Sequence, residues 1–111
     1  MNQRLKAGLW VDAQIRQCHA QALPVYVIKR GDGDAGMVLI KLIRAVGSVL
    51  ILSPTRDEDG AIAWNRPLGA DLVPESDADT WLERQKGYDP DLWIIEIEDP
   101  REQWDPTAPI L

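Results

Sequence analysis

The chain has 111 residues, of which 45% are hydrophobic and 27% charged, and its formal net charge is −6. This size and apolar content predict a single domain over residues 1–99, followed by a proline-containing C-terminal tail over residues 100–111. No apolar run approaches the roughly 18 residues that a membrane span requires, and the first residues lack the apolar core of a signal peptide. We therefore expect a cytoplasmic protein without a membrane partner.

Charge is distributed unevenly along the chain. Residues 1–55 carry seven Lys/Arg and three Asp/Glu, whereas residues 56–111 carry five Lys/Arg and fifteen Asp/Glu. A polyanion is bound by clustered basic side chains, so this acidic chain is not expected to bind nucleic acid. We expect the basic residues of the first half to meet acids of the second half across the sheet, with Lys29, Arg30, Lys41 and Arg44 near acids such as Glu96 and Glu98.

The first predicted element is a helix over residues 9–22. Val11, Ile15, Cys18 and Ala22 recur at spacings of four, three and four, which places them on one helical face. Apolar residues alternate over residues 5–9, so a short extended lead-in is the alternative for that stretch. Cys18 is the single cysteine and cannot form an internal disulfide, so we expect it to pack in the core.

Four strands are predicted in the middle of the chain. Pro24 ends the helix and a β-branched run over residues 25–28 predicts the first strand. Residues 37–43 are almost entirely apolar, which predicts a central strand. Residues 49–52 form the expected third strand, which Ser53 and Pro54 should end, and residues 61–65 form a brief fourth strand.

The second half of the chain predicts a helix and a final strand. Proline and acidic residues favour a helix start at residue 74, and Gly87 favours an end after residue 86. In residues 92–98, Glu96 and Glu98 alternate with isoleucines, which indicates a strand with one solvated face. The order predicts an α+β domain with an N-terminal helix, a mainly antiparallel three- or four-strand meander, a second helix and a final strand.

The most distinctive stretch is Arg30-Gly31-Asp32-Gly33-Asp34-Ala35-Gly36, which lies between two apolar runs. Glycines and aspartates favour a sharp reversal, so we predict a hairpin with Gly33 or Gly36 at positive φ. Three roles are open for its carboxylates. The aspartates can cap their own turn and pair with Arg30 or Lys41, form part of an interaction surface, or hold a hard cation such as Mg²⁺.

Two functions follow from these alternatives. The leading prediction is a non-catalytic interaction module for a protein partner, without a cofactor, because no activated nucleophile, metal cluster or complete phosphate loop is visible. The alternative is a Mg²⁺-dependent phosphate-processing enzyme built on Asp32, Asp34 and Lys41, with Glu96 or Glu98 as a further ligand. The oligomeric state does not follow from the sequence.

The chain contains five tryptophans and no phenylalanine. Tryptophan is rarely fully buried and is enriched at binding hot spots. Trp10, Trp81 and Trp93 lie in periodic segments, so we expect them in the core. Trp64 and Trp104 lie outside such segments and are the candidate contact residues.

Several segments together resemble a bacterial family of small proteins known as domain of unknown function 1491. They occur in order over nearly the whole chain: Leu5-Lys6-Ala7, Trp10-Val11, Arg30-Gly31-Asp32, Asp34-Ala35-Gly36, Leu39-Ile40-Lys41, Tyr88-Asp89-Pro90-Asp91-Leu92-Trp93 and Glu96-Ile97-Glu98-Asp99. The resemblance implies a compact α+β domain in a cytoplasmic bacterial protein. It implies no activity.

Overall fold

A computed structural model describes residues 6–69 and 72–111. The part of the predicted lead-in at residues 7–9 is helical, and Leu5 lies outside the described residues. In chain order the elements are α1 (Ala7–Ala20), β1 (Val25–Lys29), β2 (Val38–Ala45), β3 (Ser48–Arg56), β4 (Ile62–Asn65), β5 (Val73–Pro74), α2 (Glu75–Tyr88) and β6 (Trp93–Glu98).

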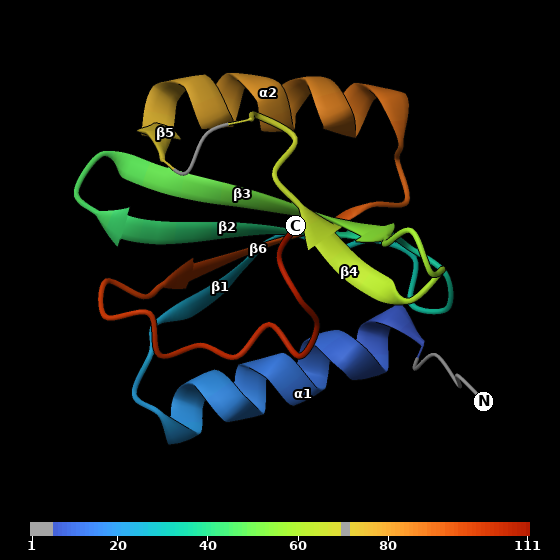
Figure 1. The fold of residues 1–111 in the computed structure, drawn as a ribbon, viewed down its shortest axis with the longest axis horizontal. Coiled ribbons are helices and arrows are strands. Elements are labelled where there is room, and N and C mark those ends of the chain that lie inside the picture. The colour runs from blue at the N-terminus through green and yellow to red at the C-terminus, as the bar shows by residue number, and fades with distance from the viewer. Residues whose placement is uncertain (1–5, 70–71) are drawn as a thin grey trace.

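The predicted α+β class is confirmed, and the elements form three layers. Figure 1 shows the sheet between α1 on one face and α2 on the other. The strands follow the order β1-β6-β2-β3-β4, and β5 pairs with β3. The sheet is mixed, because β2 and β6 run parallel while the other neighbours are antiparallel.

The predicted hairpin at residues 30–36, which would pair β1 with β2, is wrong, whereas β2, β3 and β4 do form an antiparallel three-strand meander. β6 lies between β1 and β2, antiparallel to the first and parallel to the second. Residues 30–36 therefore cross from one side of β6 to the other and join strands that are not neighbours. The prediction assumed that strands adjacent in sequence also pair in space, which is the common arrangement but is not required.

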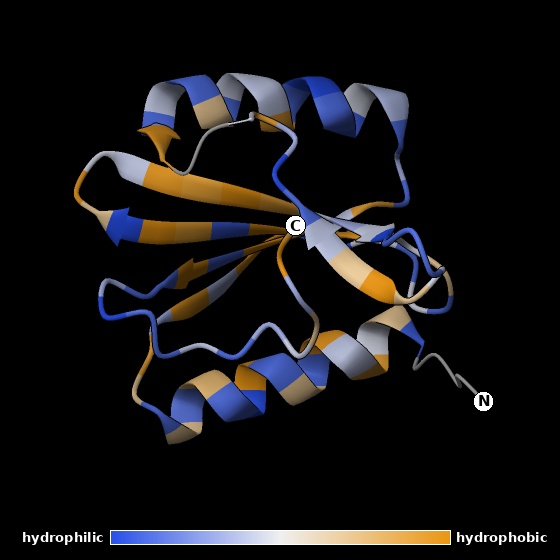
Figure 2. Ribbon diagram, in the orientation of Figure 1, coloured by the Kyte–Doolittle hydropathy of each residue, from blue (hydrophilic) through white to orange (hydrophobic). Residues whose placement is uncertain are grey.

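The central position of β2 is confirmed by burial on both of its faces. Val38, Ile40 and Leu42 belong to the core that includes α1, whereas Leu39 belongs to the core that includes α2. A strand covered on both sides requires a continuous apolar run, because each face packs against a helix layer. Figure 2 accordingly shows hydrophobic residues along the central strands and hydrophilic ones on much of the helices.

Several predicted ends differ from the structure by a few residues; α1, for example, ends at Ala20 and not at residue 22. β3 continues through Pro54 to Arg56, where Pro54 is paired with Trp64 of β4. Both main-chain hydrogen-bonding groups of Trp64 are directed to the C-terminal tail, so a proline opposite Trp64 loses no ladder bond to β4. α2 extends past Gly87 to Tyr88, because glycine weakens a helix without always ending it.

Candidate functional site

The segment over residues 30–36, here called the 30–36 loop, caps its own turn. Oδ2 of Asp32 accepts hydrogen bonds from the main-chain N–H groups of Asp34 at 3.3 Å and Ala35 at 2.8 Å. This confirms the turn-capping role for one aspartate. The main-chain carbonyls of Gly33 and Asp34 accept from Gly8 and Ala7 at the start of α1, at 2.9 and 3.4 Å. The loop therefore satisfies two donors that a helix N-terminus leaves unpaired.

The 30–36 loop is also bound to the start of β6. The main-chain N–H of Asp32 donates to the carbonyl of Asp91 at 2.8 Å, and the indole N–H of Trp93 donates to the carbonyl of Asp32 at the same distance. The guanidinium of Arg30 lies 5.1 Å from the ring centroid of Trp93, within cation–π range.

The prediction of positive φ at Gly33 or Gly36 is wrong, because the glycines with positive φ are elsewhere, at Gly47, Gly60 and Gly69. Gly36 is required by close approach. A Cβ added there would lie under 3.0 Å from the main-chain carbonyl oxygens of Asp91 and Asp32. Glycine thus allows two backbones to touch at this point.

The two halves of the predicted Mg²⁺ site lie on opposite faces of the sheet. Asp34 forms an exposed ion pair with Lys6 at 3.5 Å, on the side of α1. Lys41 points to the side of α2, where Nζ lies 3.2 Å from Glu96. Because side chains alternate along a strand, Glu98 shares the face of Glu96. The fold does not bring Asp32 and Asp34 together with Glu96, Glu98 and Lys41.

Lys41 is a buried cation held by three carboxylates. Its side chain is 6% exposed, and Nζ lies 2.8 Å from both Glu75 and Asp79 in addition to its contact with Glu96. Burial opposes its charge, but the hydrogen bonds from Asp79, Glu75 and Glu96 outweigh burial and raise the pKa of Lys41 above its usual 10.5. In the described residues, no three His, Cys, Asp or Glu side chains are arranged to hold a metal ion.

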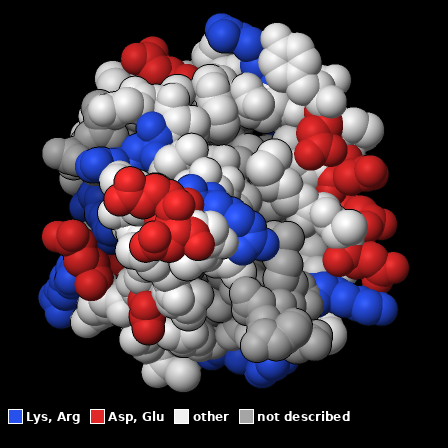
Figure 3. All heavy atoms as spheres, turned by 45° about the vertical axis from the view of Figure 1, so that its right-hand side comes forward, with Lys and Arg blue, Asp and Glu red and all other residues white. Residues whose placement is uncertain are grey.

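The expected meeting of basic and acidic halves is correct for Lys41 and for Arg44. Arg44 Nη1 lies 3.0 Å from the fully buried carboxylate of Asp99. Lys29 instead donates to the main-chain carbonyls of Pro90 and Leu92, at 2.7 and 3.0 Å. Figure 3 shows acidic and basic side chains interspersed on one face, with a column of acidic side chains along its edge.

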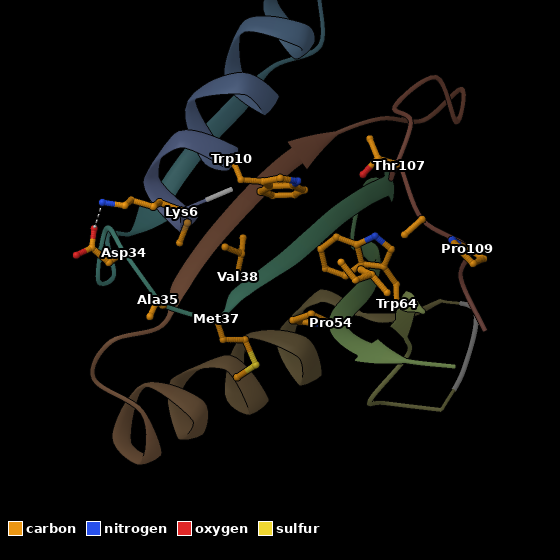
Figure 4. A pocket seen from close by; sticks show the side chains of 14 residues that line it. Lys6, Trp10, Asp34, Ala35, Met37, Val38, Pro54, Trp64, Thr107 and Pro109 are labelled. Carbon is orange, nitrogen blue, oxygen red and sulfur yellow. Dashed lines mark ion pairs between the residues drawn. The ribbon is translucent and has the colours of Figure 1, made fainter. Parts of the chain in front are cut away.

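An open cavity of about 570 Å³ lies beside the 30–36 loop, on the face that α1 covers. We call it the Trp10 groove. Figure 4 shows Trp10 of α1 and Trp64 of β4 beside Val38, with the Lys6–Asp34 ion pair at one edge. The walls are mainly apolar and come from α1, β2, β3, β4 and the tail, including Ala7, Val38, Pro54, Ile62 and Ala108.

The prediction that Trp64 and Trp104 are exposed contact residues is corrected by their burial. They are 6% and 5% exposed, and their rings meet edge to face at 6.5 Å between centroids. The indole N–H of Trp104 donates to Gln14 of α1 at 3.0 Å. Trp64 reaches the surface only as a wall of the Trp10 groove. The sequence pattern failed here because both residues pack through contacts distant in sequence.

The tail is fixed at several points. Oδ1 and Oδ2 of Asp99 accept from the main-chain N–H groups of Gln103 and Trp104, at 2.7 and 2.9 Å. Farther along, Trp64 donates its main-chain N–H to Pro109 at 2.8 Å and accepts from Leu111 at 2.8 Å. These bonds attach the predicted tail to the domain at Trp104 and at its last residues.

Sequence reasoning missed Trp10 as a surface residue and Lys6 as a charged residue beside it. Helical periodicity predicts Trp10 in the core, and its ring does pack against the core, but it is only half-buried and also lines the Trp10 groove. The available signal was its position one residue before the apolar stripe that begins at Val11. A large ring at the edge of such a stripe covers the core with one face and leaves the other accessible.

The fold defines a three-layer α+β domain with a mixed sheet. The chain belongs to the family described as Protein of unknown function (DUF1491), whose profile matches residues 5–104. No curated protein matches the chain. None of the described helices combines the length and apolarity needed to cross a membrane.

Solved structures of related proteins share this fold. A crystal structure of a DUF1491 family protein from Caulobacter crescentus CB15 is 33% identical, with a TM-score of 0.86, and the match covers 97% of this chain and 100% of that chain. An NMR structure of a DUF1491 family protein from the same organism is 32% identical, with a TM-score of 0.82 and 99% of each chain covered. Protein Atu0922 from A. tumefaciens is 27% identical, with a TM-score of 0.70 and 86% of each chain covered.

Proposed function

We propose that this protein is a non-catalytic interaction module of the bacterial cytoplasm that binds a protein partner in the Trp10 groove. The observation that carries the proposal is an open, mainly apolar cavity of about 570 Å³ with two tryptophans in its walls. Protein interfaces concentrate binding energy in such places, where a buried aromatic centre is surrounded by a polar rim. Lys6 and Asp34 supply that rim here.

The distribution of carboxylates also supports an interaction module over a Mg²⁺-dependent enzyme. Asp34 lies beside Lys6 on the α1 side, whereas Lys41 is paired with Glu96 on the α2 side. A phosphate-processing site would need these groups around one cation. The Trp10 groove needs no rearrangement of the sheet to receive a partner.

The test is affinity capture from the producing cell with matched baits. Trp10→Ala should lose a partner that the wild type captures, and the purified partner should bind this variant at least roughly tenfold more weakly, as expected for a tryptophan hot spot. Leu9→Ala is the control, because Leu9 is 57% exposed on the same helix and does not line the groove. Ile62→Lys, at an exposed position in the groove wall, should reproduce the loss without removing a core contact.

Two outcomes would contradict this function. One is a partner that binds wild type, Trp10→Ala and Ile62→Lys equally well. The other is phosphate-ester turnover that requires Mg²⁺ and disappears in Asp34→Asn, which would favour the enzyme instead. Thermal melts of each bait must show a folded domain before either outcome is interpreted.

A further inference from the structure

The Trp10 groove presents a hydrogen-bond donor that the protein itself does not use. Trp64, Trp93 and Trp104 each donate their indole N–H to an acceptor within the chain. Trp10 and Trp81 make no such bond to the described residues, and of these two it is Trp10 that lines the groove, where its ring lies 5.9 Å from that of Trp64. Every buried side-chain polar atom of the described residues has a partner, so the Trp10 indole N–H is open to solvent or to a ligand.

Trp64, the neighbouring tryptophan, shows which acceptor group binds an indole N–H on this side of the groove. The indole N–H of Trp64 donates to the main-chain carbonyl of Pro106, at 2.9 Å. Pro109, three residues later, lines the groove and accepts a hydrogen bond from the main chain of Trp64 at 2.8 Å. The proline-containing tail of the chain is thus hydrogen-bonded to Trp64, one of the two groove tryptophans. Trp10, the second, lies directly beside it.

Strand addition, another mode of peptide recognition, fits this wall less well. Strand addition needs free main-chain groups along a sheet edge. At Trp64, both the main-chain N–H and the carbonyl are already bonded to the tail. Polyproline II segments need no such ladder, because they have no internal hydrogen bonds, keep their carbonyls free and pack their rings on aromatic side chains.

We propose that the Trp10 groove takes a proline-containing extended segment of a protein partner. The indole N–H of Trp10 donates to a main-chain carbonyl of that segment, and proline rings pack against Trp10 and Trp64. Pro54 and Ile62 close the opposite side of the groove. This inference rests on the proposed function and names the class of partner segment.

The test is a titration of the protein with a decaproline peptide. NMR signals of the tryptophan indole N–H groups report the binding. We expect a saturable shift of the Trp10 indole resonance that exceeds the shifts of Trp81 and Trp93. Trp10→Phe keeps an aromatic ring and removes the donor, so its binding should weaken roughly fivefold, the effect of one neutral hydrogen bond. Ile62→Lys should weaken binding without changing the Trp10 side chain, and Leu9→Ala should bind as the wild type does.

Controls with a Gly/Ser peptide of equal length and with an Ala-rich helical peptide separate the classes of ligand. The inference is overturned if decaproline produces no saturable shift, or if the helical peptide binds as tightly. If decaproline fails while the cellular partner still depends on Trp10, the proline class is rejected and the interaction module stands. If decaproline binds through Trp10 but no cellular partner depends on it, the groove recognises proline and the proposed module function fails.

Discussion

The indole N–H of Trp93, the first residue of β6, donates a 2.8 Å hydrogen bond to the main-chain carbonyl of Asp32. Asp32 in turn holds the turn of the 30–36 loop through its carboxylate. The loop thereby connects α1 with the start of β6, and its glycines permit the close contacts that this connection needs. Close packing accounts for Gly31 and Gly36 of this loop, and turn capping accounts for Asp32.

Gly31→Ala should destabilise the domain. An added Cβ would lie under 3.0 Å from the carbonyl of Asp91 and from the Trp93 ring, and such overpacking costs about 1 to 3 kcal/mol. Gly33→Ala is the matched control, because nothing lies within 4 Å of its Cβ position and the φ there is not positive. Urea unfolding should show a lower midpoint for Gly31→Ala alone. Equal midpoints for the two variants would contradict the close-approach argument.

Lys41→Met should destabilise the domain by roughly 2 kcal/mol or more, because it leaves Glu75, Asp79 and Glu96 close together without a cation. Lys86→Met is the control. Lys86 pairs with Glu83 on the surface of α2, and such helix pairs contribute only about 0.3 to 0.5 kcal/mol. Chemical denaturation of both variants at neutral pH measures the difference. Similar losses of unfolding free energy in the two variants would show that the buried cation contributes no more than the surface one.

The stability difference between wild type and Lys41→Met should persist into alkaline solution. Burial alone would lower the pKa of Lys41, but its carboxylate partners raise it above the usual 10.5. A raised lysine pKa means that the stabilisation is complete below the unfolded-state value and declines only as pH rises through the folded-state value. The difference in unfolding free energy should therefore stay constant from neutral pH up to 10.5. A decline of this difference below pH 10.5 would contradict a raised pKa of Lys41.

Cys18 should be inert in the native protein. Its side chain is fully buried, and burial, assisted by the negative charge of Asp99, raises the pKa of the thiol. Since the thiolate is the reactive form, a buried thiol with a raised pKa reacts slowly. Labelling with a chromogenic disulfide should be slow in buffer and complete rapidly in denaturant. Fast stoichiometric labelling of the folded chain would show that the site opens readily.

Removal of residues 105–111 should lower stability without unfolding the sheet. Trp64 would lose its main-chain bonds to Pro109 and Leu111 and its indole bond to Pro106. Each such bond contributes about 0.5 to 1.5 kcal/mol, so the total loss should be roughly 2 to 4 kcal/mol. A melting experiment measures this loss of stability, and Trp fluorescence follows the exposure of Trp64. An unchanged melting temperature would mean that the tail contributes nothing to the fold.

Local patterns predicted most of the elements and one buried strand correctly. The continuous apolar run of β2 indicates a strand covered on both faces, and the structure buries it between two helix layers. The alternation at Glu96 identified β6 as a strand. What the pattern could not supply is the pairing partner, because an alternating strand has no local feature that distinguishes a parallel from an antiparallel neighbour.

The candidate site was harder to predict for the same reason. Trp64 and Trp104 lie outside periodic segments, but the tail and α1 bury them through contacts far apart in sequence. Asp34 and Lys41 are close in sequence, yet strand β2 carries Lys41 to the opposite face. Turn chemistry at Asp32 depends only on its next few neighbours, and that part of the prediction is confirmed.

The place of β6 between β1 and β2 has a consequence for synthesis on the ribosome. β6 is the last strand to be made, so β1 and β2 emerge before the strand that pairs with both of them. Until then, each has main-chain N–H and carbonyl groups along an open edge, which can pair with other chains. A nascent chain that stops before residue 93 thus leaves β1 without a neighbouring strand and one edge of β2 open.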